Sequence, residues 1–186
     1  MANILKVKPV GLDKVIHKIG GKIYELSEKL NVELQGYPRC YILQNEGEKK
    51  TIEARFDNGE YSRSLIFAEG NKFFFVSPER EVEVKKNYLE TRIELYVIAN
   101  TKECYPSILH KADKEIETEV LNVLWELTEV QNVEVESNID KVFNRYNNRI
   151  SQAYEYEYTD SMTDIHLFKV LIKLKPYEAQ LENNRC

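Results

Sequence analysis

The chain has 186 residues, of which 42% are hydrophobic and 31% charged, so it is long enough for one folded domain with a sizeable core. Its formal net charge of −5 argues against a broad nucleic-acid-binding face, because such faces are basic. The first residues lack the apolar run of a signal peptide, and no run approaches the roughly 20 apolar residues of a membrane span. We expect a protein that has no membrane association and is kept, or assembled, in a cytoplasm.

The first strong element is a helix from about Leu12 to Leu30, which follows an extended start over residues 1–11. Its apolar residues recur every three or four positions, so they share one face. Gly20 and Gly21 lie inside this pattern, where each costs about 1 kcal/mol relative to alanine. They mark a kink, a point where another backbone comes close, or a weakness that the fold tolerates. The apolar stripe consists of Leu12, Val15, Ile16, Ile19, Ile23, Leu26 and Leu30.

The next region, residues 32–76, has the short strands and turn signals of an antiparallel meander. Pro38 has no amide hydrogen to donate, so we expect the beginning of its strand to lie at a sheet edge. The sequence Asp57-Asn58-Gly59 is a strong hairpin signal. The strands expected in this region are Tyr37–Leu43, Thr51–Phe56, Tyr61–Ala68 and Lys72–Val76.

A central strand and a second helix follow a charged stretch over residues 79–87. Apolar and polar residues alternate over Tyr88–Asn100, which predicts a strand with one buried and one exposed face. The helix pattern over Glu115–Val130 has one apolar stripe, with acids along the rest. The strand face and the helix stripe each need a partner, so together they predict the main core. Its residues are Leu89, Thr91, Ile93, Leu95, Val97 and Ala99 on the strand, with Ile116, Val120, Val123, Leu124, Leu127 and Val130 on the helix.

The C-terminal part is expected to contain a short strand, a short helix and a long final strand. Pro176 ends the final strand, and residues from about 177 form a loose tail. The whole pattern predicts one α+β domain over residues 1–186, with two main helices packed on one face of an antiparallel sheet. The three expected elements are Asn132–Glu136, Asn138–Phe143 and Ile165–Leu174.

No stretch carries a catalytic signature. The histidines form no HxH or HxxxH pair, and the cysteines match no metal-ligand spacing. We therefore expect surface or boundary histidines, reduced thiols, no metal and no cofactor. These residues are His17, His110 and His166, with Cys40, Cys104 and Cys186.

Two further patterns leave alternatives open. The run Tyr154-Glu155-Tyr156-Glu157-Tyr158 fits an exposed edge or subunit contact, since tyrosine is enriched at interfaces. It fits equally an ordinary strand with buried aromatic rings. On the final strand, one face carries lysines that could meet phosphate, although an acidic chain favours a solvated outer face. These lysines are Lys169, Lys173 and Lys175.

The order of the expected elements is a helix, a small β meander, a long strand, a second helix and a final strand. It is defined by Leu12–Leu30, by Tyr37–Leu43 with Pro38, and by Tyr88–Asn100, Glu115–Val130 and Ile165–Leu174. This layout resembles that of the small tail-terminator and tail-completion proteins of tailed bacteriophages. Those proteins pack two helices against an antiparallel sheet and assemble as rings at the head–tail joint.

The resemblance implies a virion structural protein and not an enzyme. It would be a head–tail joining or tail-terminator subunit, assembled in the host cytoplasm into a ring at the neck of a tailed phage. Its partners would be further copies of the chain and neighbouring neck or tail-tube proteins. DNA would pass through the acidic ring without specific binding, because like charges repel. The candidate interface residues are Tyr154, Tyr156, Tyr158, Asp57, Asn58 and Gly59.

Two alternatives belong to other functional classes. The first is a cytosolic adaptor or binding domain for an unknown ligand. The second is a metal-assisted hydrolase in which Asp57, Glu60 and Glu94 converge, although Asp57 and Glu60 fit a turn with solvated acids better.

Overall fold

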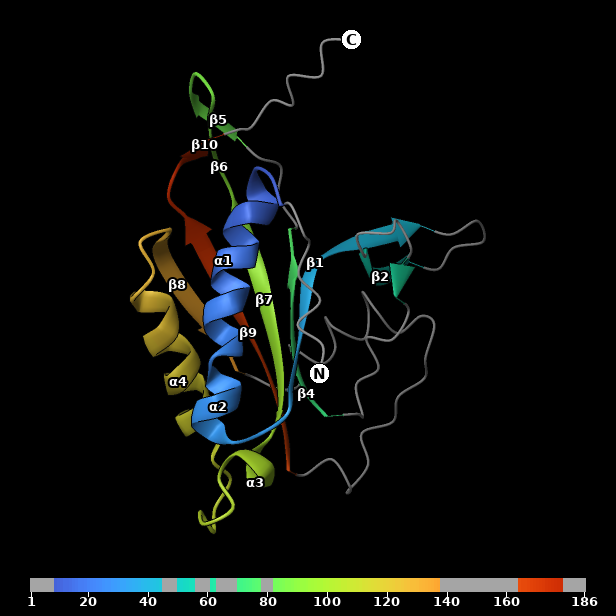
Figure 1. Ribbon diagram of the computed structural model, residues 1–186, viewed down its shortest axis with the longest axis vertical. Coiled ribbons are helices and arrows are strands. Elements are labelled where there is room, and N and C mark those ends of the chain that lie inside the picture. The colour runs from blue at the N-terminus through green and yellow to red at the C-terminus, as the bar shows by residue number, and fades with distance from the viewer. Residues whose placement is uncertain are drawn as a thin grey trace.

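The computed structural model has a seven-stranded sheet with helices on one face and a small three-stranded sheet at one end (Figure 1). This arrangement confirms the α+β fold class expected from the sequence. The residues described are 9–44, 50–55, 61–62, 70–77, 82–137 and 164–178. The elements are α1 (Leu12–Tyr24), α2 (Leu26–Leu30), β1 (Leu34–Gln44), β2 (Lys50–Arg55), β3 (Tyr61–Ser62), β4 (Asn71–Val76), β5 (Val82–Lys85), β6 (Tyr88–Glu90), β7 (Arg92–Asn100), α3 (Thr101–Cys104), α4 (Asp113–Trp125), β8 (Val130–Glu136), β9 (Ile165–Leu174) and β10 (Tyr177–Glu178).

The first predicted helix is present, but it is interrupted near its end. Glu25 separates α1 from α2, whereas Gly20 and Gly21 both lie inside α1. The glycine pair therefore does not break the helix, and the interruption lies elsewhere. Asn31 follows α2 with a positive φ of 51°, the left-handed conformation that commonly ends a helix.

β1 connects two parts of the main sheet. Its first half pairs in parallel with β4, and its second half pairs antiparallel with β2, which in turn pairs with β3. The expected antiparallel meander is therefore wrong for β4, although it holds for β1, β2 and β3. A hairpin signal specifies only the pairing of adjacent strands, whereas the pairing of β1 with β4 depends on contacts beyond them. The full strand order is β3-β2-β1-β4-β7-β9-β8.

Two sequence predictions concern Pro38 in β1 and the hairpin after β2. Pro38 lies between Gly36 and Arg39, where the register between β1 and β4 shifts. This position suits proline, which has no amide hydrogen to donate to a neighbouring strand. Within the described residues, the part of β1 before Pro38 pairs with β4 alone, so its other side is an edge of the sheet. Arg55 pairs with Tyr61, so the hairpin predicted between β2 and β3 is confirmed, while its turn lies outside the described residues.

The predicted strand Tyr88–Asn100 divides at Thr91 into two strands of different sheets. β7 lies in the middle of the main sheet between β4 and β9, whereas β6 pairs with β5 and β10 in the small sheet. β9 has the bounds predicted from the sequence, and β8 extends the predicted strand Asn132–Glu136 by two residues at its start. β10 corrects the loose tail expected from residue 177, because Tyr177 pairs with Leu89.

The second predicted helix ends earlier than its apolar spacing indicated. α4 stops at Trp125, and Val130 begins β8. Two turns follow the helix, in which the amide of Leu127 donates to the carbonyl of Leu124 and the amide of Val130 to that of Leu127, each at 3.2 Å. Leu127 and Val130 are still buried, so apolar spacing typical of a helix continues through a turn that is not helical.

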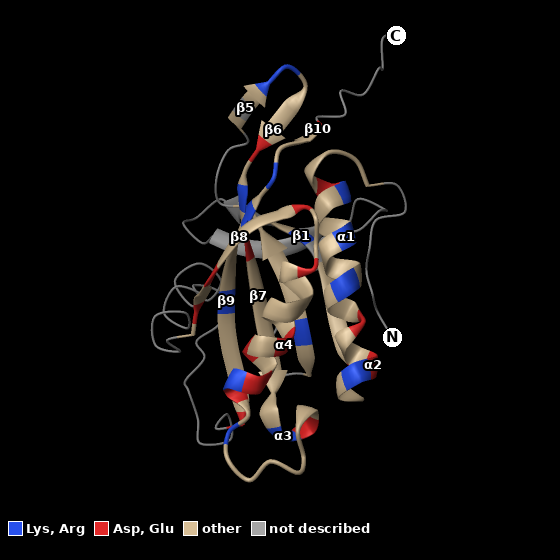
Figure 2. Cartoon of the chain, turned by 90° about the vertical axis from the view of Figure 1, so that its left-hand side faces the viewer, with Lys and Arg blue, Asp and Glu red and all other residues tan. Residues whose placement is uncertain are grey.

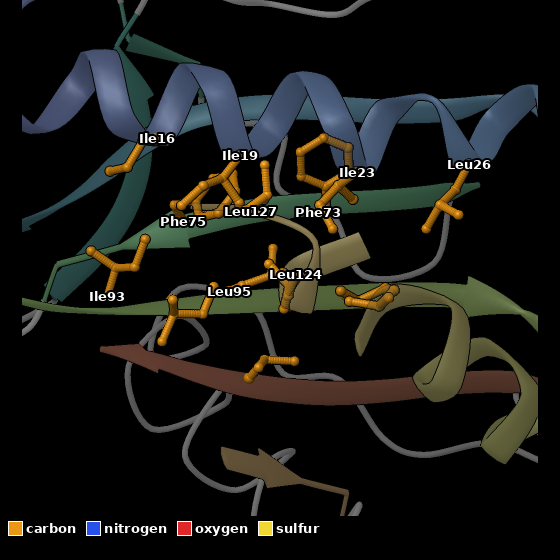
Figure 3. Close-up of a cluster of buried hydrophobic side chains, with 14 of the residues drawn as sticks. Ile16, Ile19, Ile23, Leu26, Phe73, Phe75, Ile93, Leu95, Leu124 and Leu127 are labelled. Carbon is orange, nitrogen blue, oxygen red and sulfur yellow. The ribbon is translucent and has the colours of Figure 1, made fainter. Parts of the chain in front are cut away.

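The main core lies between α1, α4 and one face of the sheet (Figure 3). The apolar stripes of both helices point into it, as expected, and the sheet contributes Phe73, Phe75, Ile93 and Leu95. The opposite face of β7 is also buried, so the prediction of one exposed face is wrong. There the rings of Phe74 and Tyr96 stack with centroids 5.0 Å apart.

Candidate functional site

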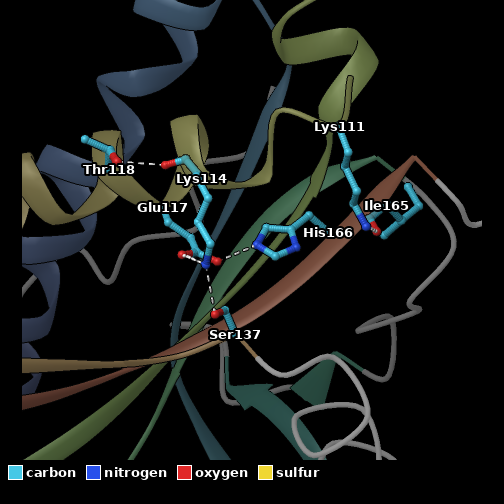
Figure 4. A network of polar contacts seen from close by, with 7 residues as sticks. All are labelled: Lys111, Lys114, Glu117, Thr118, Ser137, Ile165 and His166. Atoms are coloured by element: carbon cyan, nitrogen blue, oxygen red, sulfur yellow. Dashed lines mark hydrogen bonds and ion pairs between the residues drawn. The ribbon is translucent and has the colours of Figure 1, made fainter. Parts of the chain in front are cut away.

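The first polar cluster of the described chain joins β9 to α4 (Figure 4). Nε2 of His166 lies 2.9 Å from Oε1 of Glu117, and both side chains are buried. The other oxygen of Glu117 accepts a hydrogen bond from Nζ of Lys114 at 2.7 Å. The same ammonium donates to Oγ of Ser137 at 3.1 Å. The cluster therefore holds α4 against the end of β8 and against β9.

His166 corrects the expectation of a surface or boundary histidine, because only 3% of the residue is exposed. Burial lowers the pKa of His166, and this effect outweighs the neighbouring carboxylate of Glu117, which raises it. The ring of His166 stacks on Phe168 with centroids 5.2 Å apart. The pair is enclosed within the fold, so its geometry serves helix–sheet packing.

The second polar cluster lies on the opposite face of the sheet. Nζ of Lys169 is 3.3 Å from Oε1 of Glu94 and 3.1 Å from Oε2 of Glu136. The hydroxyl of Tyr96 donates to the other oxygen of Glu94 at 2.8 Å. Lys169 and Glu94 are both buried, so the ammonium is neutralised by carboxylates from neighbouring strands.

This cluster corrects two expectations. Lys169 does not lie on a solvated outer face, because it is buried and forms ion pairs with two carboxylates. Lys173 is partly exposed and pairs with Glu90 at 2.9 Å. Glu94, the candidate for the metal-assisted hydrolase, is buried and already hydrogen-bonded. Its proposed companions, Asp57 and Glu60, lie outside the described residues.

A cavity of about 580 Å³ opens beside the beginning of α1. His17, predicted on the first helix, lines it together with side chains of both charge signs. Lys18 forms an ion pair with Glu129 at its side, and hydrogen bonds from Lys18 and Thr128 lower the pKa of Glu129 although burial opposes this. The lining residues are Pro9, Gly11, Lys14, Val15, His17, Lys18, Glu129, Tyr177 and Glu178.

The β5–β6 hairpin, residues 82–90, projects from one end of the molecule (Figure 1). Val82 and Val84 are 60% and 50% exposed, and Tyr88 is also exposed. Figure 2 shows a basic tip, formed by Lys85 and Lys86. Nζ of Lys85 lies 5.4 Å from the centroid of the Tyr88 ring, a cation–π contact within the hairpin. β5 lies within the charged stretch over residues 79–87, where the alternation of valine with charged residues is a strand signal.

The two described cysteines are buried. Burial raises the pKa of Cys40, and burial together with the charge of Glu103 raises the pKa of Cys104 to about 11. Sγ of Cys104 lies 3.8 Å from Oδ1 of Asn71. Cys186 lies outside the described residues.

The interface residues predicted from the sequence belong to two segments. Tyr154, Tyr156 and Tyr158, and the turn residues Asp57, Asn58 and Gly59, all lie outside the described residues.

Three further findings concern metal binding, membrane spans and similarity to known proteins. Within the described ranges, no group of three or more His, Cys, Asp or Glu side chains is arranged to hold a metal ion. Among the described helices, none has the length and apolar character needed to cross a membrane. Comparison with known protein families and with curated proteins finds no match for this chain.

Proposed function

We propose that this chain is a virion structural protein, a head–tail connector or tail-terminator subunit that forms a ring of identical copies at the neck of a tailed phage. The observation that carries the proposal is the β5–β6 hairpin. Val82 and Val84 are exposed on an element that projects from the body of the fold. Exposed apolar side chains on a projecting element are typical of a surface that docks on another protein.

The polar clusters support the same interpretation by their position. His166 with Glu117 and Lys169 with Glu94 are buried, and each pair connects different elements of the fold. Acid–base side chains that serve a substrate are commonly found in an open cleft. In the described chain the first pair instead holds α4 against the sheet and the second joins neighbouring strands, as a rigid assembly subunit requires.

The layout and charge of the chain also fit the proposal. Two main helices on one face of a mainly antiparallel sheet is the layout of the phage proteins that the sequence resembles, and this support is an analogy of fold. A net charge of −5 suits a ring through which DNA passes, since an acidic wall repels the phosphate backbone.

The mass of the protein in solution tests this function. We expect a monomer or mixed species at low concentration, and a closed ring at high concentration or with the neighbouring neck or tail protein. Analytical ultracentrifugation measures the mass, and electron microscopy of negatively stained samples shows whether the assembly is closed. A protein that stays monomeric at every concentration and with every virion partner is not a ring subunit.

The cavity beside α1 favours a second candidate, an adaptor or binding domain for a small ligand. Lys14, Lys18, Glu129 and Glu178 all line it, with Lys18 paired to Glu129, so its lining would suit a ligand with both charge signs. Such a protein would stay monomeric, and a bound ligand would raise its melting temperature. Val15→Trp, which places a large ring at the cavity wall, should abolish that increase. A ligand-induced increase that persists in Val15→Trp would place binding elsewhere.

A further inference from the structure

We propose that the β5–β6 hairpin of one copy docks on the C-terminal end of α4 of a second copy, around Trp125 and Glu126. This inference rests on the proposed ring and names the two surfaces that meet in it. The two surfaces differ from one another, so each copy presents one hairpin and one receiving end. Repeated contacts of this head-to-tail kind generate a ring when the rotation between copies closes.

The hairpin combines apolar and basic side chains at one projecting tip. Val82 and Val84 are two positions apart on β5, so they point to the same side of the strand. Lys85 and Lys86 follow them and are exposed. Asn87 adopts a φ of 65° in the turn, and β10 pairs with the far side of β6. The tip is therefore held by two pairings and presents a fixed surface.

The end of α4, called here the receiving end and formed by Trp125 and Glu126, has the complementary character. Trp125 is the last residue of α4 and is 57% exposed, which is unusual for so large an apolar ring. Glu126 follows it and is exposed, and the last turn of α4 contains no basic residue. A helix C-terminus carries negative partial charge, so this end attracts cations.

The two surfaces are complementary in charge, and both expose apolar side chains. A lysine ammonium over the face of an indole ring is a favourable cation–π contact, and Glu126 offers a carboxylate to the second lysine. Val82 and Val84 can cover the remaining face of Trp125, which removes apolar surface from water on both copies. Figure 1 places the hairpin at one end of the molecule and α4 along its flank, so a second copy is the natural source of the partner surface.

Charge reversal on each surface gives a test that distinguishes loss of the docking contact from a general loss of stability. The hairpin variant is Lys85→Glu with Lys86→Glu, and the receiving-end variant is Glu126→Lys. Each alone should raise the concentration needed for half assembly by about tenfold or more, because like charges then face each other. An equal mixture of the two should recover assembly, since each reversed surface meets an opposite charge on the other chain. Sedimentation velocity measures the assembled fraction.

Trp125→Ala should weaken assembly by a similar factor, and Leu109→Ala is its matched control. Leu109 is a fully exposed apolar residue outside both surfaces, so its loss should leave assembly unchanged. All the residues changed are at the surface, and the melting temperature of each variant should stay near that of the parent chain.

Three outcomes overturn the docking. If every variant assembles like the parent chain, the ring forms through other surfaces and the proposed function survives without this contact. If the parent chain never assembles, both proposals fail. If the mixture does not recover, the hairpin meets a different partner; reduced binding of the hairpin variant to vesicles of anionic lipid would then identify a membrane surface as that partner.

Discussion

Nε2 of His166 lies 2.9 Å from Oε1 of Glu117, and this contact joins the last long strand to α4. Burial lowers the pKa of His166 in the folded chain. In the unfolded chain the ring has its ordinary pKa of about 6.5. The unfolded state therefore binds a proton more readily, and the stability that this histidine contributes is present above that pH and is lost as the pH falls.

We predict that the free energy of unfolding falls as the pH is lowered from neutral toward the folded pKa of His166. One proton gives a slope of at most about 1.4 kcal/mol per pH unit. His166→Gln removes the titrating ring but keeps an amide that can donate to Glu117, so its slope should be smaller. Urea denaturation at a series of pH values measures the effect. His110→Gln removes a surface histidine as control, and an equal loss of slope in both variants would contradict the assignment.

Leu124 tests the main core. It is fully buried between α4 and the sheet, so Leu124→Ala should lower the free energy of unfolding by about 2–5 kcal/mol. Leu109→Ala removes an equally large but exposed side chain and should change it by less than about 0.5 kcal/mol. Chemical denaturation compares the two. Similar values for both would mean that α4 does not pack as described.

Lys169 tests the second polar cluster. Lys169→Ala removes a buried ammonium that contacts the buried carboxylate of Glu94 and should cost about 3–5 kcal/mol. Adding Glu94→Gln removes the buried charge while keeping an acceptor for Tyr96, so the double variant should be more stable than Lys169→Ala. Lys175→Ala, at an exposed position directly after β9, is the control. A double variant that is less stable than the single one would show that the charge of Glu94 is not the cause.

The buried thiols give a prediction about reactivity. In Cys186→Ser, the remaining Cys40 and Cys104 should react slowly with Ellman's reagent at about pH 8, because both are buried and have raised pKa values. Both should react rapidly once the chain is unfolded in denaturant. Rapid reaction of either thiol in the native protein would contradict its burial.

The tyrosine run stays a candidate interface. Replacing Tyr154, Tyr156 and Tyr158 together by serine should impair ring formation and leave the melting temperature of the monomer nearly unchanged, if these rings contact a neighbour. Sedimentation velocity and circular dichroism melts measure the two effects. A variant that unfolds instead would identify these tyrosines as core residues.

Much of the local structure follows from the sequence because it depends on near neighbours. The three- and four-residue spacing of Ile16, Ile19 and Ile23 predicts α1, and the alternation of Phe168, Val170 and Ile172 predicts β9 with its observed bounds. The same spacing predicts α4 but extends it beyond its observed end at Trp125. Leu127 and Val130 continue its spacing in a turn, and no glycine or proline marks the end.

The sequence by itself determined the two long helices, most strands of the main sheet and the apolar face that joins them, because periodicity is a property of a few consecutive residues. Only the tertiary structure decided the parallel pairing of β1 with β4 and the burial of both faces of β7. It also decided the partners of the buried ionisable groups. Glu117 is 49 positions from His166, and Glu94 is 75 positions from Lys169. A charged side chain in a strand signals solvent exposure unless a distant element supplies the opposite charge, and that element is brought near only by the folding of the whole chain.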